Sequence, residues 1–96
     1  QPGTIVVFDR GYNDFSFFGR LTEEGVFFVT RMKAGTRYEV VESRSTPQRR
    51  HVLRDETIRL TGPHARQTCP QELRQIEVWD PDAERLLVFL TNHLTL

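Results

Sequence analysis

Two short apolar runs near the beginning of the chain predict two buried strands. Residues 4–8 read Thr-Ile-Val-Val-Phe, and residues 26–29 read Val-Phe-Phe-Val. Neither run alternates with polar residues, which is typical of strands that are covered on both faces. Between the two runs, Phe15, Phe18 and Leu21 recur at three-residue spacing. This spacing indicates the buried stripe of an amphipathic helix.

The polar residues around this stripe predict where the helix begins and ends. Asn13 or Asp14 can cap its first turn, and Gly25 follows its expected end near Glu24. A strand, a helix and a second strand within about thirty residues form a βαβ unit. We therefore expect the two strands to be parallel and joined by a right-handed crossover.

After Lys33 the apolar runs give way to shorter, partly alternating stretches separated by turns. We predict strands at 36–43, at 52–61 (as one or two strands broken near Asp55 and Glu56), at 73–79 and at 86–90, with loops over 45–50, 64–70 and 80–84. Short connections of this kind join antiparallel neighbours. The second part of the chain is therefore predicted as an antiparallel meander that follows the parallel unit.

Length and composition limit the class of protein. A chain of 96 residues is one small domain or a piece of a larger one. Because it does not begin with Met and ends on the apolar residues 94–96, we expect a piece of a longer protein. No apolar run approaches the roughly 20 residues of a membrane-spanning helix, and no signal-peptide pattern is present. The single cysteine, Cys69, excludes an internal disulfide and suits a reducing, cytoplasmic setting.

Positive charge is concentrated in the middle of the chain, although the formal net charge is zero. Residues 31–66 carry nine basic and four acidic side chains, a net charge of +5, so the remainder carries −5. Twelve of the thirteen basic residues are Arg, whose planar guanidinium can bind phosphate in a bidentate manner. On charge alone, a biased composition and a solvated surface are the simpler explanation. A phosphate-bearing partner is compatible with the same pattern.

Asp9 is the strongest candidate for chemistry because it directly follows the first apolar run and precedes Gly11. In open α/β sheets, ligands are held at the carboxyl ends of the strands. A carboxylate in such a position can bind Mg²⁺. The alternative is a turn aspartate that pairs with Arg10 or caps the helix, and position alone does not decide between them. Asp14 is more easily explained as an N-terminal helix residue.

Other candidate groups have simpler explanations. Asp80 and Asp82 flank a proline between two predicted strands and indicate a hairpin turn. Trp79 could stack on a nucleic-acid base, but we expect it in the core. No glycine-rich phosphate loop and no nucleophile elbow around a serine is present. The remaining metal-ligand types have spacings that match no common zinc motif: His51, His64, His93 and Cys69.

The residues around Asp9, together with later stretches, resemble bacterial insertion-sequence DDE transposases. More narrowly, they resemble the IS-four-type group, which carries a β-strand insertion before the final catalytic Glu. The resemblance extends over essentially the whole chain, and the ordered set of motifs is more specific than any single one. The motifs are 8–15 (FDRGYNDF), 25–33 (GVFFVTRMK), 58–62 (IRLTG), 78–80 (VWD) and 90–92 (LTN).

This resemblance implies an α+β fold, with a fragment of a ribonuclease H-like core followed by an antiparallel insertion. Residues 1–33 would belong to the core with its parallel βαβ unit, 34–85 to the β-strand insertion, and 86–96 to the strand that leads back. In this family two Asp and one Glu hold Mg²⁺ or Mn²⁺ for DNA strand cleavage and transfer. Asp9 matches the second Asp, as a catalytic and metal-binding residue. The first Asp and the Glu would lie outside this sequence, so we expect the chain alone to be inactive and to hold no firmly bound metal.

The resemblance also implies partners and a location. DNA, as transposon ends and target, would be the partner in the bacterial cytoplasm, the full-length protein would self-associate, and no membrane would be involved. An alternative from another class is a non-catalytic nucleic-acid-binding or interaction module derived from a transposase. The residues expected to contact DNA phosphates are Arg31, Lys33, Arg37, Arg49, Arg50 and Arg54.

Overall fold

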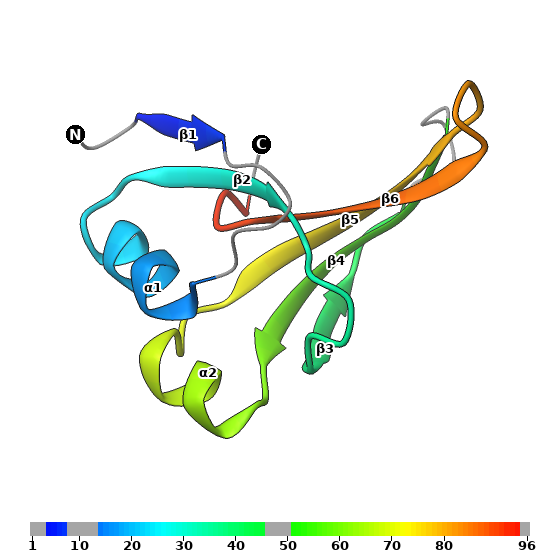
Figure 1. Ribbon diagram of the computed structural model, residues 1–96. Helices are drawn as coiled ribbons and strands as arrows, with labels where there is room; N and C mark the ends of the chain where they lie inside the picture. The colour runs from blue at the N-terminus through cyan, green and yellow to red at the C-terminus, as the bar shows by residue number, and fades with distance from the viewer. Residues whose placement is uncertain (1–3, 8–13, 46–50, 95–96) are drawn as a thin grey trace.

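Within residues 4–7, 14–45 and 51–94, which the computed structural model describes, the strands form one six-stranded sheet and two short helices lie against it (Figure 1). The strand order across the sheet is β1-β2-β6-β5-β4-β3. In chain order the elements are β1 (Ile5–Val7), α1 (Phe15–Glu23), β2 (Phe27–Arg31), β3 (Tyr38–Ser43), β4 (Val52–Leu60), α2 (Pro63–Thr68), β5 (Leu73–Asp80) and β6 (Arg85–Thr91).

The first three elements form the predicted βαβ arrangement. β1 and β2 are parallel, with Ile5 beside Phe27 and Val7 beside Val29. The helix α1 lies between them in the sequence, as the three-residue apolar spacing indicated. The parallel pairing and the helix are therefore confirmed.

The ends of α1 follow local side-chain and backbone chemistry. Asp14 is the N-cap residue, and its carboxylate accepts a hydrogen bond from the Phe17 N–H at 3.2 Å. After the helix, Gly25 adopts a φ of 75°, which glycine reaches without a steric penalty. Of the two candidate caps, Asp14 is thus the one used, in agreement with its assignment as a helix N-terminal residue.

The expectation of a ribonuclease H-like core followed by a separate insertion is wrong. β6 is antiparallel to both of its neighbours, and Thr91 lies beside Val29 of β2 and beside Arg74 of β5. The strands assigned to an insertion, β3 to β5, therefore continue the same sheet. Strands hold 48% and helices 19% of the described residues, so the fold is a mixed six-stranded sheet with two short helices. Local alternation identifies strands but does not identify their partners in a sheet.

The first apolar run is less buried than predicted. β1 forms one edge of the sheet, where Ile5 is 50% exposed and Val7 is 75% exposed. Only Val6 packs against the core, as a partly buried residue. A short apolar run indicates that its residues favour a strand. Whether both faces of that strand are buried depends on the packing of other elements, which the run itself does not determine.

Three further expectations also need correction. Residues 63–68 form the helix α2 rather than a loop, and β4 continues from Val52 to Leu60 with one irregularity near Arg54 rather than a break at 55–56. Trp79 is 39% exposed rather than in the core. Its strand extends with β6 into a hairpin that projects away from both helices (Figure 1).

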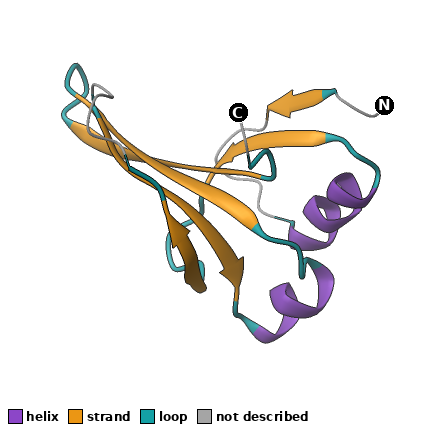
Figure 2. Ribbon diagram, turned by 180° about the vertical axis from the view of Figure 1, so that it is seen from behind, coloured by secondary structure: helices purple, strands orange, loops and turns teal. Residues whose placement is uncertain are grey.

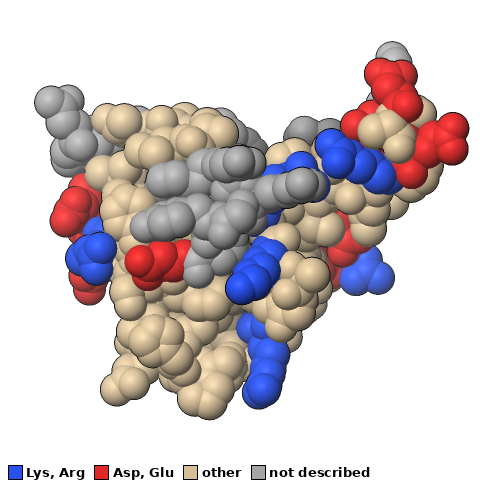
Figure 3. All heavy atoms as spheres, in the orientation of Figure 1, with Lys and Arg blue, Asp and Glu red and all other residues tan. Residues whose placement is uncertain are grey.

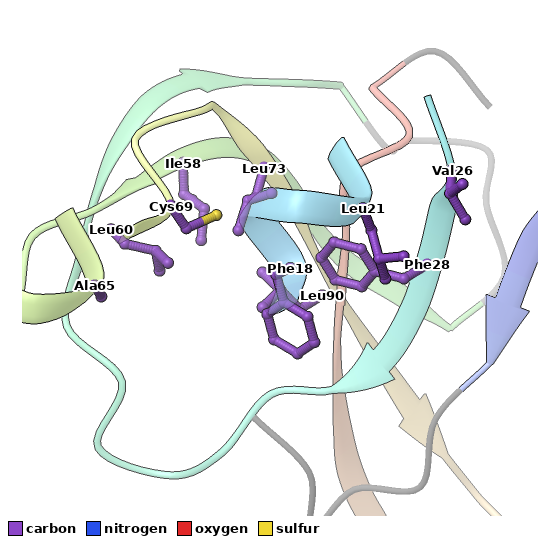
Figure 4. Packing of buried hydrophobic residues seen from close by; sticks show 10 residues of the cluster. All are labelled: Phe18, Leu21, Val26, Phe28, Ile58, Leu60, Ala65, Cys69, Leu73 and Leu90. Carbon is purple, nitrogen blue, oxygen red and sulfur yellow. The ribbon is translucent and has the colours of Figure 1, made fainter. Parts of the chain in front are cut away.

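The hydrophobic core lies between the sheet and the two helices, which cover the same face (Figure 2). Phe18 of α1 stacks on Phe28 of β2 with ring centroids 4.4 Å apart. None of the described helices is long and apolar enough to span a membrane. Figure 4 shows the ten buried apolar side chains of this core, which are Phe18, Leu21, Val26, Phe28, Ile58, Leu60, Ala65, Cys69, Leu73 and Leu90.

Candidate nucleic-acid interface

Three of the residues predicted for chemistry or DNA contact lie outside the described residues: Asp9, Arg49 and Arg50. The catalytic and metal-binding assignment of Asp9 therefore stays a prediction that rests on the sequence. The described residues show how the strand that precedes Asp9 in the sequence is paired. Val7, the last residue of β1, lies directly beside Val29 of β2, two residues before the basic residue Arg31.

Two of the predicted DNA-contacting residues line one open pocket of about 460 Å³. Lys33 and Arg37 come from the connection between β2 and β3, and His64 comes from α2. All three side chains are exposed. Phe15, at the start of α1, supplies an aromatic wall. The pocket thus joins segments that lie up to fifty residues apart in the sequence.

Hydrogen bonds in the β2–β3 connection fix the position of these basic residues. Thr36 donates from its hydroxyl to the Lys33 carbonyl at 2.7 Å, and its N–H donates to the same oxygen at 3.2 Å. Gly35, between them, has a φ of 86°, which closes the turn. The Thr61 N–H donates to the Arg37 carbonyl at 3.1 Å and ties this connection to the end of β4. Lys33 and Arg37 are therefore held on a braced turn.

The second wall of the pocket begins at α2. Pro63 occupies the first turn of this helix, where its fixed φ and missing N–H are tolerated. His64 follows and lines the pocket beside it. The sequence pattern predicts a loop at His64 and gives no other role to this residue than that of a possible zinc ligand. The Gly62-Pro63 pair is a signal for the helix instead, because proline is common at the first helical position.

The remaining predicted DNA contacts lie elsewhere. Arg31 is half-buried on β2 beside Phe89 and does not line the pocket. Arg54 is exposed on β4, and its guanidinium lies 3.8 Å from the carboxylate of Glu77. The structure therefore brings together Lys33 and Arg37 but not Arg31 or Arg54.

Several arginines of the basic segment are paired with carboxylates inside the sheet. Arg59 lies 3.5 Å from Glu39 and 3.0 Å from Glu72. Arg44 lies 3.4 Å from Asp55. By contrast, no carboxylate is among the described residues that line the pocket. At the surface, acidic side chains gather at the tip of the β5–β6 hairpin, and acidic and basic side chains lie close together at the side of the molecule where α1 lies (Figure 3).

Asp55 is the centre of a buried ion network. Arg74 donates from Nε to one Asp55 oxygen at 2.7 Å and from Nη2 to the other at 2.5 Å. The hydrogen bond to Asp55 raises the pKa of Arg74 above its ordinary value, against the opposing effect of burial. Arg44 joins the network and also donates to the Leu94 carbonyl at 2.9 Å. These residues hold β4, β5 and the end of the chain together and are structural.

The described residues do not bring His51, His64, His93 and Cys69 together as a zinc site. In the described part of the chain, no group of three or more His, Cys, Asp or Glu side chains could hold a metal ion. Burial raises the pKa of the Cys69 thiol to about 11, so it is a poor metal ligand at neutral pH. Asp80 instead accepts hydrogen bonds from the N–H groups of Asp82 and Ala83, as predicted for a turn.

Comparison with models of protein families, with curated proteins and with solved structures yields no match for this chain. The transposase resemblance therefore depends on the quoted motifs, and the functions it implies are proposals.

Proposed function

We propose that this chain is the part of a bacterial DDE transposase that surrounds the second acidic residue of the active site and contacts DNA. The parent protein would catalyse metal-dependent DNA strand cleavage and transfer during transposition. The observation that supports this proposal most directly is the parallel β1–β2 pair, which is followed by the basic residues Lys33 and Arg37. The carboxyl ends of parallel strands meet at one edge of a sheet, where ligands are commonly held.

Asp9 would contribute one of three carboxylates in this proposal. It comes two residues after the end of β1 in the sequence. Mg²⁺ or Mn²⁺ would be held jointly by Asp9 and by the Asp and Glu of the parent protein that lie outside this sequence. Because two of the three carboxylates would come from outside this sequence, the chain by itself should not cut DNA.

The role of the described residues would be to bind the DNA backbone. Lys33 and Arg37 carry positive charge on a braced turn and line the same pocket. Positively charged side chains that meet phosphates release the counterions of the nucleic acid, which drives association. A cytoplasmic location and self-association of the parent belong to the same proposal.

The test is strand cleavage by the parent protein on DNA that carries its terminal repeats. The Asp9→Ala variant should lose cleavage to background while its affinity for the same DNA is unchanged. Asp82→Ala removes a carboxylate from the β5–β6 turn and serves as the control, which should cleave like the wild type. Cleavage near the wild-type rate by the Asp9 variant would remove Asp9 from the active site.

A non-catalytic nucleic-acid-binding or interaction module is the second candidate. It is favoured by the same pocket, whose cationic and aromatic lining could contact nucleic acid without a metal ion. The two candidates differ in one result. A parent protein that binds DNA but never cleaves it with Mg²⁺ or Mn²⁺ present would support the second.

A further inference from the structure

The pocket between the β2–β3 connection and α2 combines two kinds of surface. Lys33 and Arg37 provide cationic groups, His64 provides a polar ring, and none of the described residues that line the pocket is acidic. Phe15 and Pro63 provide an apolar wall on the other side. A pocket that only met the outer phosphates of a duplex would need the cations but would gain nothing from an aromatic wall. The combination therefore points to a ligand that carries both an anion and a flat apolar group.

We propose that this pocket binds one unpaired nucleotide unit, with its phosphate at Lys33 and Arg37 and its base against Phe15. A volume of about 460 Å³ lies within the range of small-ligand pockets, so a single nucleotide is the matching size class. Stacking of a base on an aromatic ring is available only when that base is not paired in a duplex. This inference goes beyond the proposed strand cleavage, because it needs neither a metal nor Asp9.

The pocket is also preformed rather than assembled by a ligand. The ring of Phe15 packs edge-on against the buried Phe18, with centroids 6.0 Å apart. The Thr36 hydroxyl fixes the Lys33 carbonyl, and the Thr61 N–H fixes that of Arg37. Binding to a braced site costs less conformational entropy than ordering a loose one.

The test measures binding of a fluorescein-labelled single strand of oligothymidine to the full chain by anisotropy, with EDTA present. The same strand paired with its complement is the duplex comparison, and the single strand should bind more tightly. EDTA separates this test from strand cleavage, so the proposed function can fail while the pocket still binds. Equal or tighter binding of the duplex would overturn the proposal.

Removal of the cationic side should weaken binding strongly. The double variant Lys33→Gln and Arg37→Gln should lose at least about tenfold in affinity. Its plot of log affinity against log salt should flatten by about 0.7 units, since the contact to one phosphate of a single strand is lost. Arg85→Gln removes the same kind of charge at the remote end of β6 and should bind like the wild type. A double variant that binds no worse than the Arg85 variant would refute the pocket.

Removal of the ring should also weaken binding. Phe15→Leu should lose about five- to a hundredfold in affinity, the range measured when an aromatic stacking partner is removed. Phe17→Leu removes a ring from the same helix outside the pocket and is the matched control. Phe15→Tyr changes the same residue but retains an aromatic ring. It should bind like the wild type and is therefore the control for a disturbed fold. Wild-type binding by a folded Phe15→Leu variant, or loss of binding by Phe15→Tyr, would show that the ring does not stack.

A last comparison distinguishes a free nucleotide from a nucleotide within a strand. Thymidine monophosphate and oligothymidine are added separately while the amide signals of Gly35 and Thr36 are followed by NMR. If both probes shift these signals, a single nucleotide is sufficient for binding to the pocket. If only oligothymidine shifts them, the pocket binds a nucleotide only as part of a nucleic-acid strand. Absence of shifts with both probes would overturn the proposal.

Discussion

Two groups of basic residues in this chain have different surroundings. In the β4–β5 region, Arg59 and Arg74 lie beside carboxylates, and Arg74 is only 6% exposed. In the β2–β3 connection, Lys33 and Arg37 are exposed and line a pocket whose described residues include no acid. The net charge of +5 over residues 31–66 is therefore not one continuous binding patch. The net charge of a segment overstates the basic surface that can bind a ligand when some of its basic residues form ion pairs with acids on neighbouring strands.

The largest expected effect concerns Arg74, whose buried ion pair with Asp55 should contribute to the stability of the fold. Arg74→Ala should lower the free energy of unfolding by about 3–5 kcal/mol, because it leaves the carboxylate of Asp55 buried without its main partner. Urea unfolding followed by circular dichroism measures the change. The double variant Asp55→Leu and Arg74→Met should be less destabilised than Arg74→Ala, since no unpaired charge remains. An equal loss of unfolding free energy in both variants would show that the unpaired carboxylate of Asp55 is not the cause of the destabilisation.

The buried region should also respond to pH through Cys69. Its thiol has a pKa of about 11 instead of the usual 9.0, because burial disfavours the thiolate. At neutral pH the thiolate fraction, and with it the rate of alkylation by iodoacetamide, should be about a hundredfold lower in the folded than in the unfolded chain.

The sign of the linked stability change follows from proton uptake. Between pH 9.0 and about 11 the folded state holds a proton that the unfolded state has lost, so stability should fall as the pH rises through this window. Below pH 9.0 the contribution of the thiol is complete. Cys69→Ala should remove this part of the alkaline loss, and an unchanged slope in that variant would assign the loss to other groups.

The junction of the two helices beside the pocket should be sensitive to added volume. At Gly19 a Cβ atom would lie 2.3 Å from the carbonyl oxygen of Thr68, so α1 and α2 would have to separate. Gly19→Ala should therefore lower the free energy of unfolding by about 1–3 kcal/mol, although alanine favours helix. Thermal unfolding measures it. Gly62→Ala is the control, because nothing lies within 4 Å of its added Cβ atom, and a stable Gly19→Ala variant would mean that the helices can move apart.

The smallest expected effects sharpen the comparison between the two basic regions. Arg59→Gln should cost up to about 1 kcal/mol of stability, since its ion pairs with Glu39 and Glu72 are partly exposed. The double variant Lys33→Gln and Arg37→Gln should change stability by no more than about 0.5 kcal/mol, as is usual for surface substitutions. Urea unfolding of both variants at the same salt concentration gives the values. A larger loss in the pocket variant than in Arg59→Gln would reverse the assignment of binding and structural roles.

The local elements followed from the sequence because their signals are local. The spacing of Phe15, Phe18 and Leu21 indicated α1, and its ends are set by Asp14 and Gly25. The parallel β1–β2 pair followed from the length of their connection. The turn at Asp80 followed from the ability of its side chain to accept hydrogen bonds from the backbone two and three residues later. Lys33 and Arg37 were also identified from the sequence as candidate contacts, by their place after the second strand.

Tertiary structure alone decided which distant residues meet. The position of β6 between β2 and β5 joins all described strands into one sheet. No local pattern predicts that pairing, because the alternation of side chains shows which face of a strand is buried but not which strand lies beside it. The pocket depends on it as well, since His64 and Phe15 reach Lys33 only through packing of both helices on the sheet. The sequence by itself thus determined the strands, the helix α1 and the N-cap of that helix. The fold decided which arginines meet carboxylates across neighbouring strands and brought Lys33 and Arg37 to the lining of one pocket.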